Sequence, residues 1–356
     1  MIKRNINNIF AIIVALFIFS VELSAQIVSP FNKLYLTDTS SEYSFIVSGH
    51  FHGASSNAST FPASTLQANI DTLNLLHPSF LMSLGDMFLD VNQSYIDHYQ
   101  RSLFDKLKMP LFNAVGNHDC SNGNMYEKIF GVEYFTFKKD SELFIVLNTE
   151  VNDGSIKNNQ LSFLTDVLKK ETYCKNIFIF SHRPVWAENN ERYKKLFNGN
   201  TRTMFGNNNF EEIVRPLLMN YSKEKKIYWI SGSLGGGPAS FFYDIEPETN
   251  ITFMQTAIRD QEHDAALQVN VKNGNVSFSG ISFTGQKMDL IENYTIAYWS
   301  NTLAPDQKFN YRLLPFLTLQ MILHYYFWVG FVTALFVIMI WVLFKRKIKN
   351  SKKDIT

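Results

Sequence analysis

The sequence predicts an α/β fold, because short apolar segments alternate with helical patterns along the middle of the chain. Each apolar segment ends in a small or polar turn residue, which is typical of strands that are buried on both faces of a sheet. Such an alternation favours a parallel arrangement with helices packed against it. The predicted strands are 43–48, 80–84, 110–115, 176–180 and 226–230, and the predicted helices are 65–76, 159–170 and 210–221.

Two further pairs of segments predict β-hairpins. Segments 134–137 and 142–147 flank a short polar turn, and segments 266–271 and 276–281 flank Asn273-Gly274, a strong hairpin signal. We expect these strands to form a second, antiparallel portion. The segment 187–209 contains seven asparagines and is predicted to be a long surface loop.

The C-terminal region predicts a membrane anchor. Residues 322–344 contain no Asp, Glu, Lys or Arg, and aromatic residues such as Trp328 and Trp341 lie towards both ends, as in interfacial belts. The tail 345–356 carries six basic residues and one acid, so we expect it in the cytoplasm and the body outside. The alternative is a helix buried in the core.

The N-terminal region predicts a secretory signal peptide over residues 1–25. Lys3 and Arg4 precede an apolar run, 9–21, and Ala25 supplies a small residue at a plausible cleavage point. An uncleaved anchor is the alternative. The expected organisation is then a body at 26–285, a connector at 286–321, the transmembrane helix and the basic tail.

Composition excludes several classes of protein. The chain has 356 residues, 46% of them hydrophobic and 18% charged, so it is not a disordered chain. Between the two termini the body carries 25 bases and 30 acids, and this acidic balance argues against nucleic acid as a partner. Only two cysteines, Cys120 and Cys174, are present, which excludes a disulfide scaffold and leaves one bridge or two buried thiols open.

Polar side chains follow the predicted strands at the points where they end. Carboxylate, amide and imidazole groups at successive strand ends converge at one edge of an α/β sheet. Together they suit Mn, Fe or Zn, and one carboxylate can bridge two cations that clamp a phosphoryl group. The segments are His50-Phe51-His52, Gly85-Asp86, Gly116-Asn117-His118-Asp119, Ser181-His182-Arg183-Pro184 and Gly232-Ser233-Leu234-Gly235.

Across 43–281 these motifs resemble those of the calcineurin-like metallophosphoesterases. In that family Asp-x-His, Gly-Asp-x-x-Asp, Gly-Asn-His-Asp/Glu, a lone His and Gly-His-x-His each follow a strand. The segment 116–119 matches completely, and Gly85-Asp86 and 181–184 also match. The resemblance implies a two-sheet α/β/β/α sandwich and metal-dependent hydrolysis of a phosphoester.

Residue roles carry over by position. The resemblance implies that Asp86 bridges two metals, that Asn117 and His182 bind one of them, and that His52 binds the other. It also implies that His118 protonates the leaving oxygen or steadies the phosphate, oriented by Asp119.

Two motifs depart from the family pattern. His50 occupies the position of the first Asp, and Ser233 and Gly235 occupy the positions of the last two histidines. One metal then keeps Asp86, Asn117 and His182, and the other keeps Asp86, His52 and His50. Three ligands still suffice for a catalytic metal in principle.

Three functions follow from this set of residues. The first is an anchored extracytoplasmic phosphoesterase with a reduced metal site, acting on a phosphorylated small molecule or polymer. The second is a non-catalytic module that binds phosphate or glycan, and the third is a structural envelope protein. Simpler interpretations also stand for single motifs: a structural His182, a turn at 116–119, and a loop carrying His50 and His52.

Overall fold

The computed structural model describes residues 27–37, 40–57, 59–151, 153–193, 196, 208–233, 239–302 and 314–353. Three expectations concern residues outside these ranges. They are the signal peptide at 1–25, most of the loop at 187–209, and the stretch 234–237 in the last motif.

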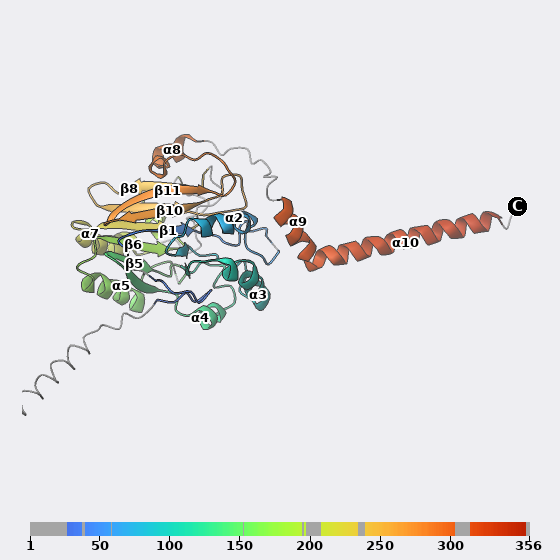
Figure 1. The fold of residues 1–356 in the computed structure, drawn as a ribbon, viewed down its shortest axis with the longest axis horizontal. Helices are drawn as coiled ribbons and strands as arrows, with labels where there is room; N and C mark the ends of the chain where they lie inside the picture. Colours follow the sequence, from blue (N-terminus) through green and yellow to red (C-terminus); the bar gives the residue numbers. More distant parts are fainter. Residues whose placement is uncertain are drawn as a thin grey trace, which may run out of the picture.

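Two β-sheets form the centre of the body (Figure 1). The first has the strand order β11-β10-β1-β2-β3, and the second has the order β4-β5-β6-β7-β9-β8. The first sheet comprises β1 (Glu42–Ser48), β2 (Leu81–Ser83), β3 (Leu111–Asn113), β10 (Ala265–Lys272) and β11 (Asn275–Ser282). The second comprises β4 (Phe135–Lys139), β5 (Glu142–Val146), β6 (Asn176–Ser181), β7 (Lys226–Ser231), β8 (Phe241–Ile245) and β9 (Ile251–Thr256).

Parallel pairing forms the centre of both sheets, and in the first sheet it extends to the edge strand β3. In the first sheet β1, β2 and β3 are parallel, and in the second β5, β6, β7 and β9 are parallel. Both predicted hairpins are confirmed, as β4–β5 and β10–β11. The expected separate antiparallel portion is wrong, because the hairpins extend the two parallel cores: β5 pairs with β6, and β10 pairs with β1. Strands β8 and β9 are not among the predicted ones.

Helices cover the outer face of each sheet. The first sheet packs on α2 (Ser64–Leu75), α3 (Gln93–Ser102) and α4 (Met125–Phe130), through buried side chains such as Leu66, Tyr99 and Leu111. The second packs on α5 (Asn158–Lys170) and α7 (Arg215–Ser222), which continues a turn of π-helix at Phe210–Val214. Short helices α6 (Val185–Glu188) and α8 (Ile296–Asn301) complete the body. The predicted two-sheet α/β/β/α sandwich is therefore confirmed.

A third apolar cluster fills the space between the sheets. The Phe45 ring from β1 stacks on Phe80 at 4.7 Å between centroids and meets Phe144 and Phe178 of the second sheet edge-on, at 5.4 and 5.2 Å. All four side chains are fully buried. Close packing of large rings fixes the separation of the two sheets, and with it the separation of the residues at their strand ends.

The C-terminal segment forms α9 (Leu314–Leu323) and α10 (Tyr325–Lys353). α9 contacts α2, and α10 extends away from the body (Figure 1). The stretch Tyr325–Arg346 is long and apolar enough to cross a membrane. The expected span 322–344 crosses a break at His324, whose Nδ1 accepts a hydrogen bond from the backbone N–H of Tyr326 at 3.3 Å and so caps the start of α10.

Substitution of the ring between the sheets tests this packing. Phe45→Ala leaves a cavity among fully buried rings, so we expect a loss of about 3–5 kcal/mol in the free energy of unfolding, against about 0.5 kcal/mol or less for Tyr173→Ala, whose side chain is 94% exposed. Denaturant unfolding of the full chain in mild detergent, followed by tryptophan fluorescence, measures both. Equal losses would contradict the inter-sheet core.

Candidate metal centre

The carboxylate of Asp86 lies at the centre of a cluster of imidazole rings. Asp86 Oδ2 is 3.1 Å from His50 Nε2, 3.4 Å from His182 Nε2 and 3.6 Å from His52 Nε2. All four residues are buried. They follow the carboxyl ends of β1 and β2 in one sheet and of β6 in the other, so the cluster joins the two sheets at one edge.

The backbone at these strand ends adopts an unusual conformation. His50 and Asp86 have φ angles of 56° and 54°, in the left-handed region, which costs about 1–3 kcal/mol per residue. Hydrogen bonds hold the turns: His50 N–H donates to Gly85 O at 3.0 Å, and His52 N–H donates to Asp86 O at 3.3 Å. This conformation turns the side chains of His50 and Asp86 towards each other.

Backbone carbonyls fix the orientation of two of the rings. His182 Nδ1 lies 2.7 Å from Leu84 O, and His118 Nδ1 lies 2.8 Å from Leu89 O, so each Nδ1 carries the proton and donates it. In the neutral ring of His182 the lone pair of Nε2 then faces the Asp86 carboxylate. Two acceptors 3.4 Å apart repel unless a proton or a metal ion lies between them.

Three buried ring nitrogens of these histidines have no hydrogen-bond partner among the described residues. Neither ring nitrogen of His52 makes a hydrogen bond in the described part of the chain, nor does Nδ1 of His50. Unsatisfied buried nitrogens are costly, and a metal ion would satisfy them. The donor set therefore fits a divalent cation.

Charge in the cluster is set by burial and by the rings. Burial alone would raise the pKa of Asp86, but the attraction of His182 and His50, with the hydrogen bond to the His50 ring and the nearby ring of His52, holds it well below its usual value. Burial, and then the nearby guanidinium of Arg259, lower the pKa of His50 well below its usual value. Asp86 is thus an anion and His50 a neutral ligand, the protonation states that metal binding needs.

The donors form two groups that share Asp86. One group is His50, Asp86 and His182, and the other is His52, Asp86 and His118; in each, the ligand atoms lie within 4.8 Å of one another. Two donors on a tetrahedral metal, each about 2.1 Å from it, lie about 3.4 Å apart. The distances around Asp86 match that spacing.

Asp119 does not contact the ring of His118 as the resemblance implies. Its buried carboxylate accepts hydrogen bonds from Phe88 N at 3.1 Å, Asn113 Nδ2 at 3.1 Å and Gly116 N at 3.0 Å. Burial, together with the charge of Asp86, raises the pKa of Asp119 to about 6. The expectation that it orients His118 is corrected: the carboxylate holds the loop, and a backbone carbonyl orients the ring.

The remaining predicted ligand, Asn117, is exposed beside His118. Its binding to the same ion as Asp86 and His182 stays a prediction, because the distances given above concern only histidine and carboxylate ligands. Ser233, at the position of a family histidine, is partly exposed with a φ of 61°, and the positions 234–237 lie outside the described residues.

Two charged residues near the cluster are not among the predicted ones. Glu150 follows β5, so the strand-end pattern that singled out Asp86 also applies to it. Arg259 follows β9, a strand that the sequence did not reveal. Burial lowers the pKa of Arg259 to about 10, against the opposing charges of Asp86 and Asp264.

Glu150 is a neutral acid near the cluster at neutral pH. Burial raises its pKa to about 8, against the attraction of Arg183, which itself forms a short double contact with Glu188 at 2.6 and 2.7 Å. The guanidinium is shared with Glu188, and its attraction only partly offsets the effect of burial on Glu150. Glu150 Oε1 has no hydrogen-bond partner among the described residues.

Three glycines, Gly85, Gly116 and Gly232, pack directly beneath the histidine cluster, which we call its floor. A Cβ at Gly116 would collide with the backbone nitrogen and the carboxylate of Asp86, and one at Gly85 would come within 2.6 Å of His182 Nδ1. A Cβ at Gly232 would collide with Leu84 O, the acceptor that orients His182. The backbone itself therefore supports the side chains that meet at Asp86.

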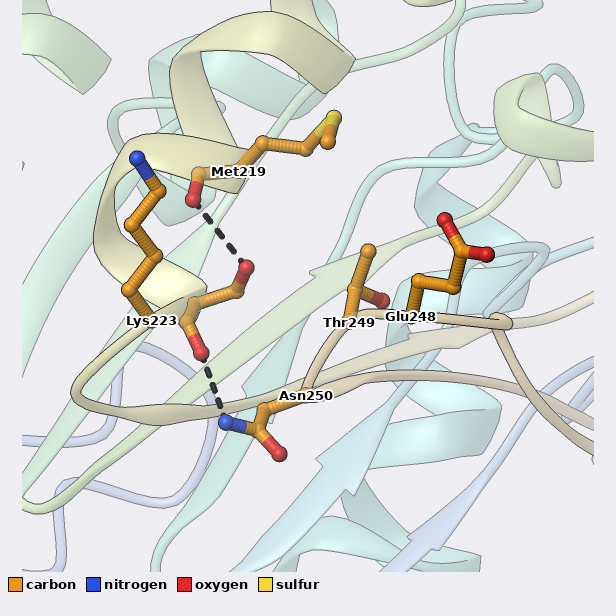
Figure 2. A pocket seen from close by; sticks show the side chains of 6 residues that line it. Met219, Lys223, Glu248, Thr249 and Asn250 are labelled. Atoms are coloured by element: carbon orange, nitrogen blue, oxygen red, sulfur yellow. Dashed lines mark hydrogen bonds between the residues drawn. The ribbon is translucent and has the colours of Figure 1, made fainter.

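A surface hollow elsewhere in the body carries no comparable chemistry (Figure 2). It lies where α7 ends and where β7 and β9 begin, which is the opposite end of these strands from the histidine cluster. Asn250 Nδ2 donates to Ser222 O at 2.7 Å, and Ser222 Oγ donates to Met219 O at 3.1 Å. The side chains of Asn250 and Ser222 are thus engaged with the backbone.

No family model matches the sequence, and no curated protein matches it. Solved structures do align with most of the body. The GAP50 anchor in the inner membrane complex of Plasmodium is 12% identical, with 74% of this chain and 98% of that chain covered and a TM-score of 0.49. An uncharacterised protein of Streptococcus pneumoniae, a predicted phosphoesterase, is 12% identical (69% and 92% covered, TM-score 0.33). Vps29 of Entamoeba histolytica, complexed with Zn²⁺, is 11% identical (67% and 99% covered, TM-score 0.27).

The partly buried acid near the cluster gives a pH-dependent prediction. The native state keeps a proton on Glu150 up to about pH 8, whereas the unfolded chain releases it near pH 4.5, so this group makes stability fall as pH rises between those values, with a slope approaching 1.4 kcal/mol per pH unit. Glu150→Gln removes the titration. Unfolding in EDTA should show the variant gaining stability relative to the wild type as pH rises.

The exposed Glu127→Gln on α4 serves as the matched control, and its stability difference should stay constant with pH. A pH-independent difference for Glu150→Gln as well would show that Glu150 is ionised in the native state.

Proposed function

We propose that this protein is a membrane-anchored extracytoplasmic phosphoesterase with a reduced metal site. The observation that carries the proposal is the position of Asp86, which is shared by two groups of imidazoles at the strand ends of both sheets. In the proposal His50, Asp86 and His182 hold the more buried ion. Asn117 would join that ion, as the resemblance implies, and His52 with Asp86 would provide for a second, more weakly held ion.

In the proposed hydrolysis the metal ion and the side chains of this protein would have different roles. A divalent cation at this site would polarise the phosphoryl oxygens and lower the pKa of a water molecule. His118 is the proton carrier for the leaving oxygen, because Leu89 O fixes its Nδ1 and leaves Nε2 for the substrate. The backbone N–H of His118 donates to Asp86 Oδ1 at 3.1 Å, which holds the proton carrier at a set position beside the metal ligands.

The ligand types guide the choice of metal. Three or four imidazoles with one carboxylate suit Zn, Mn or Fe, and they are a poor set for Mg or Ca, which prefer oxygen ligands. Because His50 is neutral, the site offers one negative charge from Asp86, and a single ion is better compensated than two.

The proposed location follows from the ends of the chain. Tyr325–Arg346 would span the membrane, and the basic tail behind it would remain in the cytoplasm, which leaves the body outside. The substrate would be a phosphorylated small molecule or polymer of the extracytoplasmic space. Nucleic acid is not expected, since the body is acidic.

A phosphate- or glycan-binding module without turnover is the second candidate. The observation that favours it is Ser233, which offers only a weak oxygen donor where the family has an imidazole. The same site would then bind a phosphate group, and loss of His118 would not change any reaction.

Metal content and turnover of matched variants separate the two. The full chain in mild detergent should contain Zn, Mn or Fe by elemental analysis, and Asp86→Ala should lose it. His118→Ala should keep the more buried ion while hydrolysis of nitrophenyl phosphate monoesters and diesters falls about 10²- to 10⁴-fold. His77→Asn, at an exposed position outside the cluster, is the control.

Each result has a distinct meaning. Metal with turnover that depends on His118 supports the phosphoesterase. Metal without turnover supports the binding module, and a wild-type chain that takes up no Zn, Mn or Fe contradicts the proposed metal site.

A further inference from the structure

We propose that Arg259 binds the phosphate group of the substrate beside the metal ligands, an inference that rests on the proposed function. Its guanidinium would supply positive charge to the phosphate at a site whose set of metal ligands is reduced.

Arg259 lies beside the segment 49–53, which carries His50 and His52. The Ile258 backbone N–H, one residue earlier, donates to Gly49 O at 3.2 Å, next to His50. One residue later, the carboxylate of Asp260 packs so closely on Gly53 that a Cβ there would collide with it. Arg259 is therefore held between two contacts with the segment that carries His50 and His52.

The backbone of Arg259 is fixed from the other side. Its N–H donates to Asp264 Oδ1 at 2.9 Å, while Asp264 Oδ2 accepts from Asp260 N at 2.8 Å and from Thr65 Oγ1 at 2.7 Å. Asp264 is 1% exposed. The carboxylate is thus occupied with the backbone of this turn and with Thr65, and the guanidinium does not form an ion pair with it.

The side chain of Arg259 has unused donors. It is partly buried, yet it forms no ion pair with any acid in the described part of the chain, and its hydrogen bond there is from Nη1 to Ile258 O at 3.3 Å. A guanidinium carries five N–H donors, so most of them remain for a ligand. A partly buried arginine without a carboxylate partner is unusual, and it suits recognition of an anion that arrives with the substrate.

The mutual effects of charge on pKa indicate that the Arg259 guanidinium lies close to His50 and Asp86. The charge of Arg259 contributes to the lowered pKa of His50, and Asp86 in turn acts on the pKa of Arg259. A phosphate held by a cation at Asp86 would then lie near the guanidinium. The planar fork can bind two phosphate oxygens at once, which a lysine ammonium cannot do.

Binding of inorganic phosphate tests this assignment without relying on turnover. Isothermal titration calorimetry of the metal-loaded full chain in detergent should show phosphate affinity falling about 10- to 100-fold in Arg259→Gln. Arg259→Lys should recover part of that loss, because it keeps the charge and loses the fork. Arg101→Gln, at an exposed position on α3, should bind phosphate as the wild type does.

Metal content and unfolding temperature, measured on the same samples, separate the possible failures. Unchanged phosphate affinity in Arg259→Gln with normal metal content would overturn the role of Arg259 and leave the proposed function standing. Loss of metal or a large drop in unfolding temperature in both Arg259 variants would show a structural residue, which also overturns the assignment. A wild-type chain that binds neither metal nor phosphate would overturn the proposed function and this inference together.

Discussion

The structure of the site depends on one buried negative charge. Asp86 is removed from water and is surrounded by imidazole nitrogens, of which at least one, His182 Nε2, presents a lone pair to the carboxylate when the ring is neutral. Such an arrangement is unfavourable by itself, because burial and acceptor–acceptor repulsion both act against it. It becomes favourable when a cation occupies the space between the donors, and the surrounding fold fixes the donors in place beforehand.

The two sheets make that preorganisation possible. His50 and Asp86 belong to strand ends of the first sheet, whereas His182 belongs to the second, so their distances depend on how the sheets pack. The Phe45 ring and its neighbours fix that packing. A change in the apolar layer would therefore move ligands of the two sheets relative to one another, even though these phenylalanines have no part in the proposed chemistry.

Local patterns revealed most of the parallel strands and the residues at their ends. They did not reveal β8 and β9, since Asp244 and Gln255 interrupt the apolar runs, and burial of such polar residues is decided by neighbours distant in sequence. For the same reason Arg259, which follows β9, had no recognisable motif. Asp119 shows the opposite error: a residue beside His118 in sequence directs its carboxylate to the loop backbone, because three donors converge there.

The glycines beneath the cluster divide the site into parts with different freedom to vary. At Gly85, Gly116 and Gly232 the backbone of one turn rests directly on the side chains or carbonyls of another, and an added methyl group has no space. The floor therefore admits almost no substitution, whereas Asn117 and Ser233 lie towards the solvent side, where replacement displaces little. Substitutions near Asp86 would thus disturb the fold, whereas substitutions of the outer residues would not. The chemistry of the site could therefore change through its outer residues while the glycines and the buried ligands stay the same.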